Sequence, residues 1–279
     1  AMTTARDEPA RATGITELLS LDDAIATLGR SMAEQTGRRA DRARHWLRLL
    51  GSARKTGRLP PLLHQYWDSD PPAQITALFE HNARRCRAMG VTQRLWTDAS
   101  ARALLADRRP DLVAVYDSAP HPAMKCDLFR LVAVQAEGGV YLDADMALGR
   151  TAAGLWTTSP EGLVFKWDLP ERRNAPNWCF GFAPHHPCLA LVIDATARAM
   201  ADAVARDPAR ALEGILGVSG PGRFTRAVGT YLAAEGQSTS VAVRGVAEAY
   251  RRVCNGPDVL GAPLDYKATG RHWQVAAQG

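Results

Sequence analysis

The sequence predicts an α/β domain with a largely parallel sheet flanked by helices, preceded by a helical extension at the N-terminus. Short apolar runs alternate with longer segments whose apolar residues recur at helical spacing, which is the pattern of strands connected by helices. Of the 279 residues, 46% are hydrophobic and 23% are charged, so the chain can bury a substantial core. No apolar run approaches the roughly 18 residues that a membrane-spanning helix needs.

The predicted helical extension covers residues 1–58. Apolar residues recur there at helical spacing, which indicates two or three helices. Residues 38–58 contain eight Arg or Lys residues and Asp41 as the lone acid, so this face is either solvated or touches an anionic membrane surface. Two consecutive prolines at positions 60–61 stop any helix, and we therefore expect the main domain to cover residues 59–279.

The main domain begins with a predicted strand and then alternates between helices and strands. Short apolar runs predict strands over residues 62–67, 94–96, 140–142, 163–167 and 178–182. Helical spacing predicts helices over residues 73–88, 99–107, 122–136, 187–204 and 222–234. Because strands that alternate with helices usually pair in parallel, the sheet is expected to be largely parallel.

Local residues support several of these boundaries. The first strand ends at the polar, proline-rich residues 68–72. Two glycines at positions 138–139 allow a tight turn into the third predicted strand. Pro187 favours the first position of a helix, so the preceding His185 and His186 are interpreted as a turn and helix start rather than as metal ligands.

Two aspartates directly follow the predicted strand 140–142. Asp143 and Asp145 are separated by one residue, at the carboxyl end of a strand, where ligands bind in open α/β sheets. Neighbouring carboxylates repel each other, and Mg²⁺ or Mn²⁺ commonly bridges one or two of them to substrate phosphates. The pair therefore predicts either a metal site for a nucleotide diphosphate or a polar turn after a strand.

The preceding helix carries a further acid and base. Asp127 and Arg130 lie three residues apart and so share one face of the predicted helix. An internal salt bridge would explain this pair, although an exposed pair of this kind contributes only about a few tenths of a kcal/mol.

The region from Asp127 to Asp145 resembles the sugar-binding DXD region of retaining glycosyltransferases of the family 32 type. The resemblance rests on Asp127 and Arg130 at i and i+3 and on the string Gly-Gly-Val-Tyr-Leu-Asp-Ala-Asp at positions 138–145. Relatives of this type include yeast outer-chain mannosyltransferases, bacterial capsular polysaccharide glycosyltransferases and glucosylating clostridial toxins. Similar pieces follow the family's order at residues 62–67, 94–98, 177, 183–187, 219–221 and 272–273. The family's Gly-Ser-Trp after His272-Trp273 is absent here.

This resemblance implies the GT-A glycosyltransferase fold for residues 59–279. It also implies transfer of a sugar, with retention of anomeric configuration, from a nucleotide-diphosphate sugar to an acceptor hydroxyl of a saccharide or protein. We expect a UDP-sugar rather than GDP-mannose as the donor, Mn²⁺ or Mg²⁺ as the cofactor, and no nucleic-acid partner.

The resemblance further implies roles for individual residues. Asp145, Asp143 and His272 would bind the metal. The donor would be held by Trp67, Asp127, Arg130, Tyr141, Asp143, His272 and Trp273, with Trp67 stacked on the base. Catalysis would depend on Asp143, Asp145 and Asn177, with Asn177 near the anomeric centre. An amide cannot act as an ionised nucleophile, which favours same-face attack by the acceptor over a covalent glycosyl-enzyme.

Two other functions compete with this interpretation. A phosphatase of the haloacid dehalogenase type has a strand followed by DxDx(T/V), but Ala147 occupies the last position and the motif lies in the middle of the chain. A basic membrane- or nucleic-acid-binding protein with a degenerate catalytic domain would depend on residues 38–58. The complete pair of Asp143 and Asp145 speaks against it.

The cysteine pattern and the N-terminus lead to an expected location. Five cysteines form no CxxC pair and no zinc spacing, which indicates a reduced, cytosolic chain. The first fourteen residues lack the apolar segment of a signal peptide. We therefore expect a cytoplasmic protein, membrane-peripheral if residues 38–58 touch lipid, with secretion by a route that needs no signal peptide as the alternative.

Overall fold

The computed structural model of the protein describes residues 59–157, 161–167, 174–235 and 240–277. The predicted helical extension of residues 1–58, and with it the basic segment 38–58, lies outside the described residues. Within the described part of the chain, no helix has both the length and the apolar character that crossing a membrane requires.

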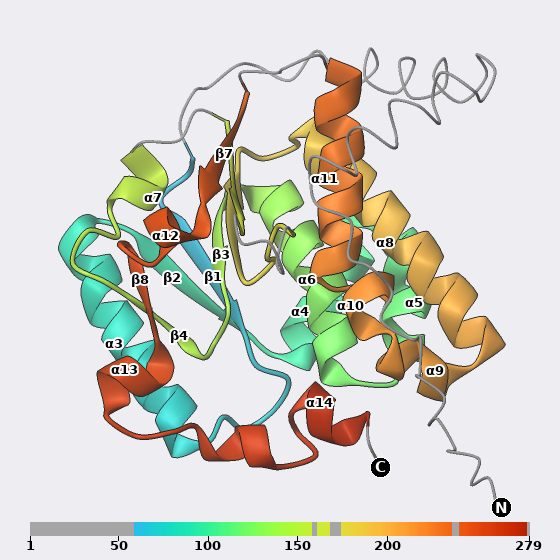
Figure 1. The fold of residues 1–279 in the computed structure, drawn as a ribbon, viewed down its shortest axis with the longest axis horizontal. Coiled ribbons are helices and arrows are strands. Elements are labelled where there is room, and N and C mark those ends of the chain that lie inside the picture. The colour runs from blue at the N-terminus through green and yellow to red at the C-terminus, as the bar shows by residue number, and fades with distance from the viewer. Residues whose placement is uncertain (1–58, 158–160, 168–173, 236–239, 278–279) are drawn as a thin grey trace, which may run out of the picture.

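A six-stranded sheet forms the centre of the domain, with strand order β2-β1-β3-β6-β5-β7 (Figure 1). Its strands are β1 (Leu62–Tyr66), β2 (Thr92–Trp96), β3 (Gly139–Leu142), β5 (Gly162–Lys166), β6 (Cys179–Phe182) and β7 (Val241–Gly245). β1 pairs in parallel with β2 and β3, and β5 pairs in parallel with β7. β6 lies between β3 and β5 and runs antiparallel to both. The predicted α/β class with a mostly parallel sheet is therefore confirmed.

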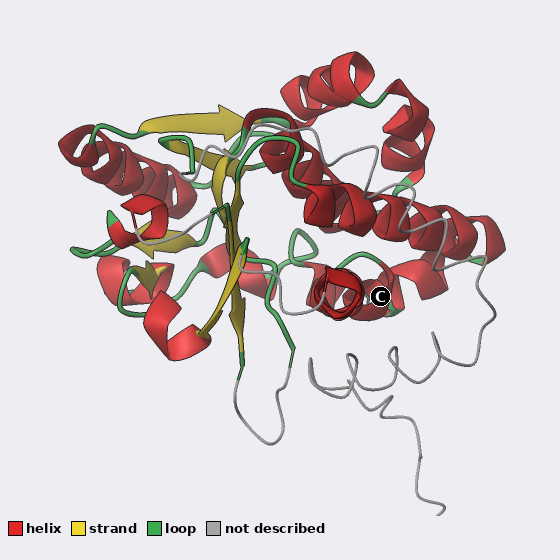
Figure 2. Cartoon of the chain, turned by 90° about the horizontal axis from the view of Figure 1, so that it is seen from above, coloured by secondary structure: helices red, strands yellow, loops and turns green. Residues whose placement is uncertain are grey.

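Helices cover both faces of this sheet, as the view from above shows (Figure 2). One layer contains α4 (Asp98–Arg108), α5 (Val113–Ser118), α6 (Pro122–Glu137), α8 (Pro187–Arg206), α9 (Pro208–Glu213), α10 (Ile215–Val218) and α11 (Pro221–Glu235). The other side carries α3 (Ala73–Met89), α7 (Gly154–Thr157), α12 (Val246–Ala249) and α13 (Gly256–Leu260). A two-stranded antiparallel sheet of β4 (Met146–Leu148) and β8 (Val253–Asn255) packs beside α3. The remaining elements are α14 (Trp273–Ala276) and the 3₁₀ turns η1 (Pro110–Leu112) and η2 (Asp265–Ala268).

Side chains of β3 alternate between the two cores. Val140 and Leu142 pack into the core under α3, α7 and α12, whereas Tyr141 packs into the core under α6, α8 and α11. Because residues two apart share a face, Asp143 follows Tyr141 on the side of α6. Gly138 and Gly139 both have positive φ, at 69° and 98°, which confirms the expected tight turn into this strand.

The five predicted strands and five predicted helices are all present, with boundaries that differ by one or two residues. Three strands escaped prediction: β4 and β8 have three residues each, and β7 has five. β4 and β8 are too short for a period to stand out, and all three segments become strands because a partner from elsewhere in the chain pairs with them. His186 caps α8 and Pro187 is its first residue, as predicted.

Candidate active site

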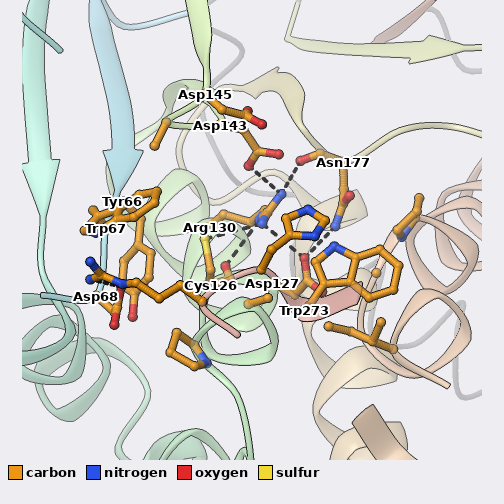
Figure 3. A pocket seen from close by; sticks show the side chains of 18 of the residues that line it. Tyr66, Trp67, Asp68, Cys126, Asp127, Arg130, Asp143, Asp145, Asn177 and Trp273 are labelled. Carbon is orange, nitrogen blue, oxygen red and sulfur yellow. Dashed lines mark hydrogen bonds and ion pairs between the residues drawn. The ribbon is translucent and has the colours of Figure 1, made fainter. Parts of the chain in front are cut away.

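A pocket opens where several strands end, and the nine predicted site residues all contribute to its lining (Figure 3). These nine are Trp67, Asp127, Arg130, Tyr141, Asp143, Asp145, Asn177, His272 and Trp273. β1 and β3 are parallel neighbours, so Trp67 and Asp143, which follow them, come to the same edge of the sheet. β6 is antiparallel, so its beginning lies at that edge, and the amide of Asp143 donates to the carbonyl of Trp178 over 2.8 Å. This reversal brings Asn177 beside the aspartates.

Asp127 is a buried carboxylate with a complete set of partners. Its side chain lies on α6 and accepts hydrogen bonds from Asn177 Nδ2 and Ser219 Oγ, both at 2.8 Å. Arg130 Nη2 lies 3.2 Å from Asp127 Oδ1. Burial raises the pKa of Asp127, while the charge of Arg130 and the hydrogen bonds from Ser219 and Asn177 oppose this rise. Three parts of the chain therefore meet at one side chain.

Arg130 connects this carboxylate to the first aspartate of the pair. Its Nη1 lies 3.0 Å from Asp143 Oδ1 and donates to the carbonyl of Asn177 over 2.8 Å. The guanidinium also lies over the ring of Tyr141, 4.6 Å from the ring centre. Burial opposes the charge, but Asp143 and the other anionic partners raise the pKa of Arg130 well above its ordinary value. It is therefore a permanent, fixed cation in the pocket wall.

Asp143 is held by two neighbours, Tyr141 and Arg130. The hydroxyl of Tyr141 donates to Asp143 Oδ1 over 2.8 Å, next to the ion pair with Arg130. Burial and the nearby charge of Asp145 raise the pKa of Asp143 to about 6, although Arg130 opposes the rise. The carboxylate thus gains from any further positive charge placed in the pocket.

Asp145 faces the C-terminal part of the chain. Lys267 Nζ lies 2.7 Å from Asp145 Oδ2, and the hydroxyl of Tyr266 donates to the same oxygen over 3.2 Å. Both residues belong to η2. His272 follows on the same segment, and its ring centre lies 6.0 Å from that of Tyr266. Burial and the charge of Lys267 lower the pKa of His272, so its imidazole is neutral near pH 7, the form that binds metals.

The predicted metal ligands line one pocket but do not form a preassembled cluster. Within the described residues, no group of three or more His, Cys, Asp or Glu side chains is arranged to hold a metal ion. Asp143 and Asp145 still supply hard carboxylate oxygens, and Mg²⁺ usually binds one or two carboxylates and completes its shell with water and substrate phosphates. The donor set therefore fits a divalent cation that binds together with a diphosphate.

Trp67 forms the opposite end of the pocket from Trp273 in the close-up (Figure 3). The guanidinium of Arg271 lies 5.5 Å from the ring centre of Trp67, and Tyr266 meets the ring edge-on at 5.0 Å. Arg271 is itself held by Ser69 Oγ at 2.8 Å and by the carbonyl of Asp70 at 3.2 Å. Trp67 Nε1 is buried without a hydrogen-bond partner in the described structure. This end is thus aromatic, and its cation, Arg271, also pairs with Asp68, whose Oδ1 lies 3.9 Å from Arg271 Nη2.

Several residues that line the pocket or contact its aspartates were missed by reasoning from the sequence. Ser219 belongs to residues 219–221, which resemble the family, but no local pattern predicts its hydrogen bond to Asp127. Tyr266, Lys267 and Arg271 carry no periodic pattern, and their position just before His272 was the available signal. Ile215 and Leu216 add an apolar wall beside Trp273.

Comparison with known proteins matches the part of the chain that contains Asp127, Arg130, Asp143 and Asp145. Residues 66–160 match the family described as a glycosyltransferase sugar-binding region containing a DXD motif. Inositol phosphoceramide mannosyltransferases 3 and 2 of Schizosaccharomyces pombe are 29% and 24% identical over 144 and 141 residues, which is 48% of this chain in each case. The chain covers 36% and 37% of their lengths, little more than a third.

A solved structure matches the whole domain. PaToxG glycosyltransferase superposes with a TM-score of 0.50, covering 95% of this chain and 98% of that one. The two sequences are 15% identical, so this similarity shows the fold alone. The sequence match places the sugar-binding region containing a DXD motif at residues 66–160, the stretch that contains Asp127, Arg130, Asp143 and Asp145.

Proposed function

We propose that this protein is a metal-dependent, retaining glycosyltransferase that transfers a sugar from a nucleotide-diphosphate sugar to an acceptor hydroxyl. The observation that carries the proposal is the network of buried Asp127, Arg130 and Asn177 with half-buried Asp143, which faces a pocket beside Asp145. A polar turn or a simple surface salt bridge would not need a buried arginine shared between two carboxylates.

Asp127 and Arg130 are proposed to hold the hydroxyl groups of the donor sugar. Asp127 is 6% exposed and Arg130 is 6% exposed, so neither can rearrange freely. Their mutual contacts fix the orientation of both side chains before a ligand binds, which reduces the entropy lost on binding. Trp67 is proposed to contact the nucleobase at the aromatic end of the pocket.

Asp143 and Asp145 are proposed to hold Mn²⁺ or Mg²⁺, with His272 available as a neutral ligand. A divalent cation bound there would neutralise the negative charge that grows on the nucleoside diphosphate as the glycosidic bond breaks. Arg130, a permanent cation 3.0 Å from Asp143, supplies positive charge to the same end of the pocket.

Retention by same-face attack is supported by the surroundings of Asp127. One oxygen of Asp127 is engaged by Asn177 and Arg130, and the other by Ser219. A carboxylate whose two oxygens are both occupied is a poor nucleophile, and Asn177 cannot ionise. We therefore propose that the acceptor hydroxyl, from a saccharide or a protein, attacks from the face that the diphosphate leaves.

A UDP-sugar is the proposed donor, and GDP-mannose is the second candidate because two relatives are named mannosyltransferases. Thermal unfolding with Mn²⁺ and UDP-glucose, UDP-galactose, UDP-N-acetylglucosamine or GDP-mannose tests both. A ligand at 100 times its dissociation constant adds about 2.7 kcal/mol to stability. Hydrolysis of the stabilising donor should require Mn²⁺ or Mg²⁺ and stop with a chelator. Full turnover after complete metal removal, or release of phosphate from simple phosphoesters, would refute the proposal.

A further inference from the structure

The second aspartate of the pair already has a cationic partner in the protein itself. Lys267 Nζ lies 2.7 Å from Asp145 Oδ2, a distance typical of a charge-assisted hydrogen bond. Among the described residues, Lys267 is the one basic side chain that forms an ion pair with Asp145. The contact joins η2, near the C-terminus, to the turn after β3.

We propose that Lys267 is an exchangeable counter-ion: it neutralises Asp145 in the ligand-free protein, leaves it when a divalent cation binds, and then contacts the diphosphate of the donor. This inference rests on the proposed function. It concerns the behaviour of a residue that belongs to neither the Asp143–Asp145 motif nor the His272–Trp273 motif.

The arrangement of charges explains why Asp145 needs a partner. Asp143 is neutralised by its ion pair with Arg130 and accepts a hydrogen bond from Tyr141. Asp145 takes part in neither contact, and it lies two residues from Asp143, so the two like charges repel each other. Without a metal, the ammonium of Lys267 supplies the positive charge that this carboxylate pair requires.

The two cations that pair with Asp143 and Asp145 differ in how firmly they are held. The side chain of Arg130 is 7% exposed and is held by Asp127, Asp143 and the carbonyl of Asn177. The side chain of Lys267 is 43% exposed, and Asp145 is 20% exposed. Partly exposed ion pairs contribute little net stability, and a lysine ammonium sits on a flexible stem. Lys267 can therefore exchange partners, whereas Arg130 stays in place.

The surroundings of Lys267 favour phosphate as its second partner. A divalent cation at Asp145 would repel the ammonium, while the donor diphosphate would bring negative charge to the same position. Arg271, the next basic residue along this segment, is engaged by Ser69, Asp70 and the ring of Trp67. The turn of α14 offers Gln274, Val275 and Ala276, none of which carries positive charge.

Calorimetric titration of Mn²⁺ into nucleotide-free protein tests the first half of the proposal. Lys267→Met keeps the length of the stem and removes the charge. Arg210→Met, on α9, is the control because it removes one basic partner of an exposed pair with Asp207. Lys267→Met should bind Mn²⁺ about fivefold more tightly than wild type, because the competing ion pair is gone. Arg210→Met should bind it like wild type.

Titration of UDP or GDP in saturating Mn²⁺ tests the second half. Lys267→Met should bind the nucleotide about tenfold more weakly, since one charged contact to the diphosphate is lost. Thermal unfolding and a Lys267→Gln variant confirm that the change is not a folding defect. If Lys267→Met and wild type have equal affinity for Mn²⁺, or equal affinity for the nucleotide, the proposal that Lys267 exchanges partners is refuted. Failure of wild type to bind Mn²⁺ and nucleotide would instead refute the proposed donor site, and the exchange with it.

Discussion

Replacing Asp127 separates its part in the fold from its proposed part in catalysis. In Asp127→Asn, the amide oxygen can accept from Asn177 while the amide nitrogen donates to Ser219, whose hydroxyl can turn to accept. The ion pair with Arg130 is lost, but Arg130 keeps Asp143 and the carbonyl of Asn177. Removal of a buried charge, whose pKa is raised, offsets that loss. Because the hydrogen bonds to Asn177 and Ser219 are kept, we expect the free energy of unfolding to change by no more than about 1.5 kcal/mol.

Asp127→Ala should behave differently because it leaves partners without a bond. Asn177 Nδ2 and Ser219 Oγ would both lose their acceptor, and each unsatisfied buried group costs about 1–3 kcal/mol. We therefore expect a loss of about 2–6 kcal/mol in the free energy of unfolding. Chemical denaturation of both variants at pH 7 measures the difference between them.

Turnover gives the second measurement on Asp127. If its carboxylate accepts a hydrogen bond from a donor hydroxyl, Asp127→Asn should lower kcat/KM about 10- to 100-fold, while UDP with Mn²⁺ binds as in wild type. Asp117→Asn is the control, because it removes the partner of Arg102 on the exposed surface of α5. Wild-type turnover in Asp127→Asn, combined with a stability loss above about 3 kcal/mol, would show that Asp127 has a structural role only.

Three further changes have defined outcomes. Asp145→Asn should lower Mn²⁺-dependent turnover about 10³-fold or more, with little change in the free energy of unfolding. Metal binding equal to that of wild type would contradict the proposed metal site. Trp67→Ala should weaken nucleotide binding about tenfold. Unchanged affinity in calorimetry would show that the nucleobase does not stack on Trp67. Burial lowers the pKa of His186 from 6.5 to about 4, so stability should fall by up to about 3 kcal/mol as pH drops through that interval. His186→Asn keeps a cap for α8 and should remove this dependence in pH-dependent unfolding.

Local sequence patterns were sufficient to place pairs of site residues that lie in the same helix or strand. Asp127 and Arg130 share a face because a helix repeats every 3.6 residues, and Tyr141 and Asp143 share one because a strand repeats every two. Both relations depend on neighbours in the sequence: Arg130 pairs with Asp127, as the helix spacing suggested, and Tyr141 donates to Asp143. The glycines before β3 and the proline at the start of α8 are equally local signals.

Contacts between distant segments depended on the tertiary structure. The antiparallel direction of β6 turns Asn177 toward Asp127, and no local pattern in Cys179–Phe182 records that direction. The bond from Ser219 and the ion pair from Lys267 join residues that lie far from their partners in sequence. A single polar residue in a loop has no period, and its partner is chosen by how the surrounding helices and strands pack. Local sequence patterns therefore predict the fold class and the acidic motif. Packing between distant segments decides which basic side chains neutralise the carboxylates of that motif.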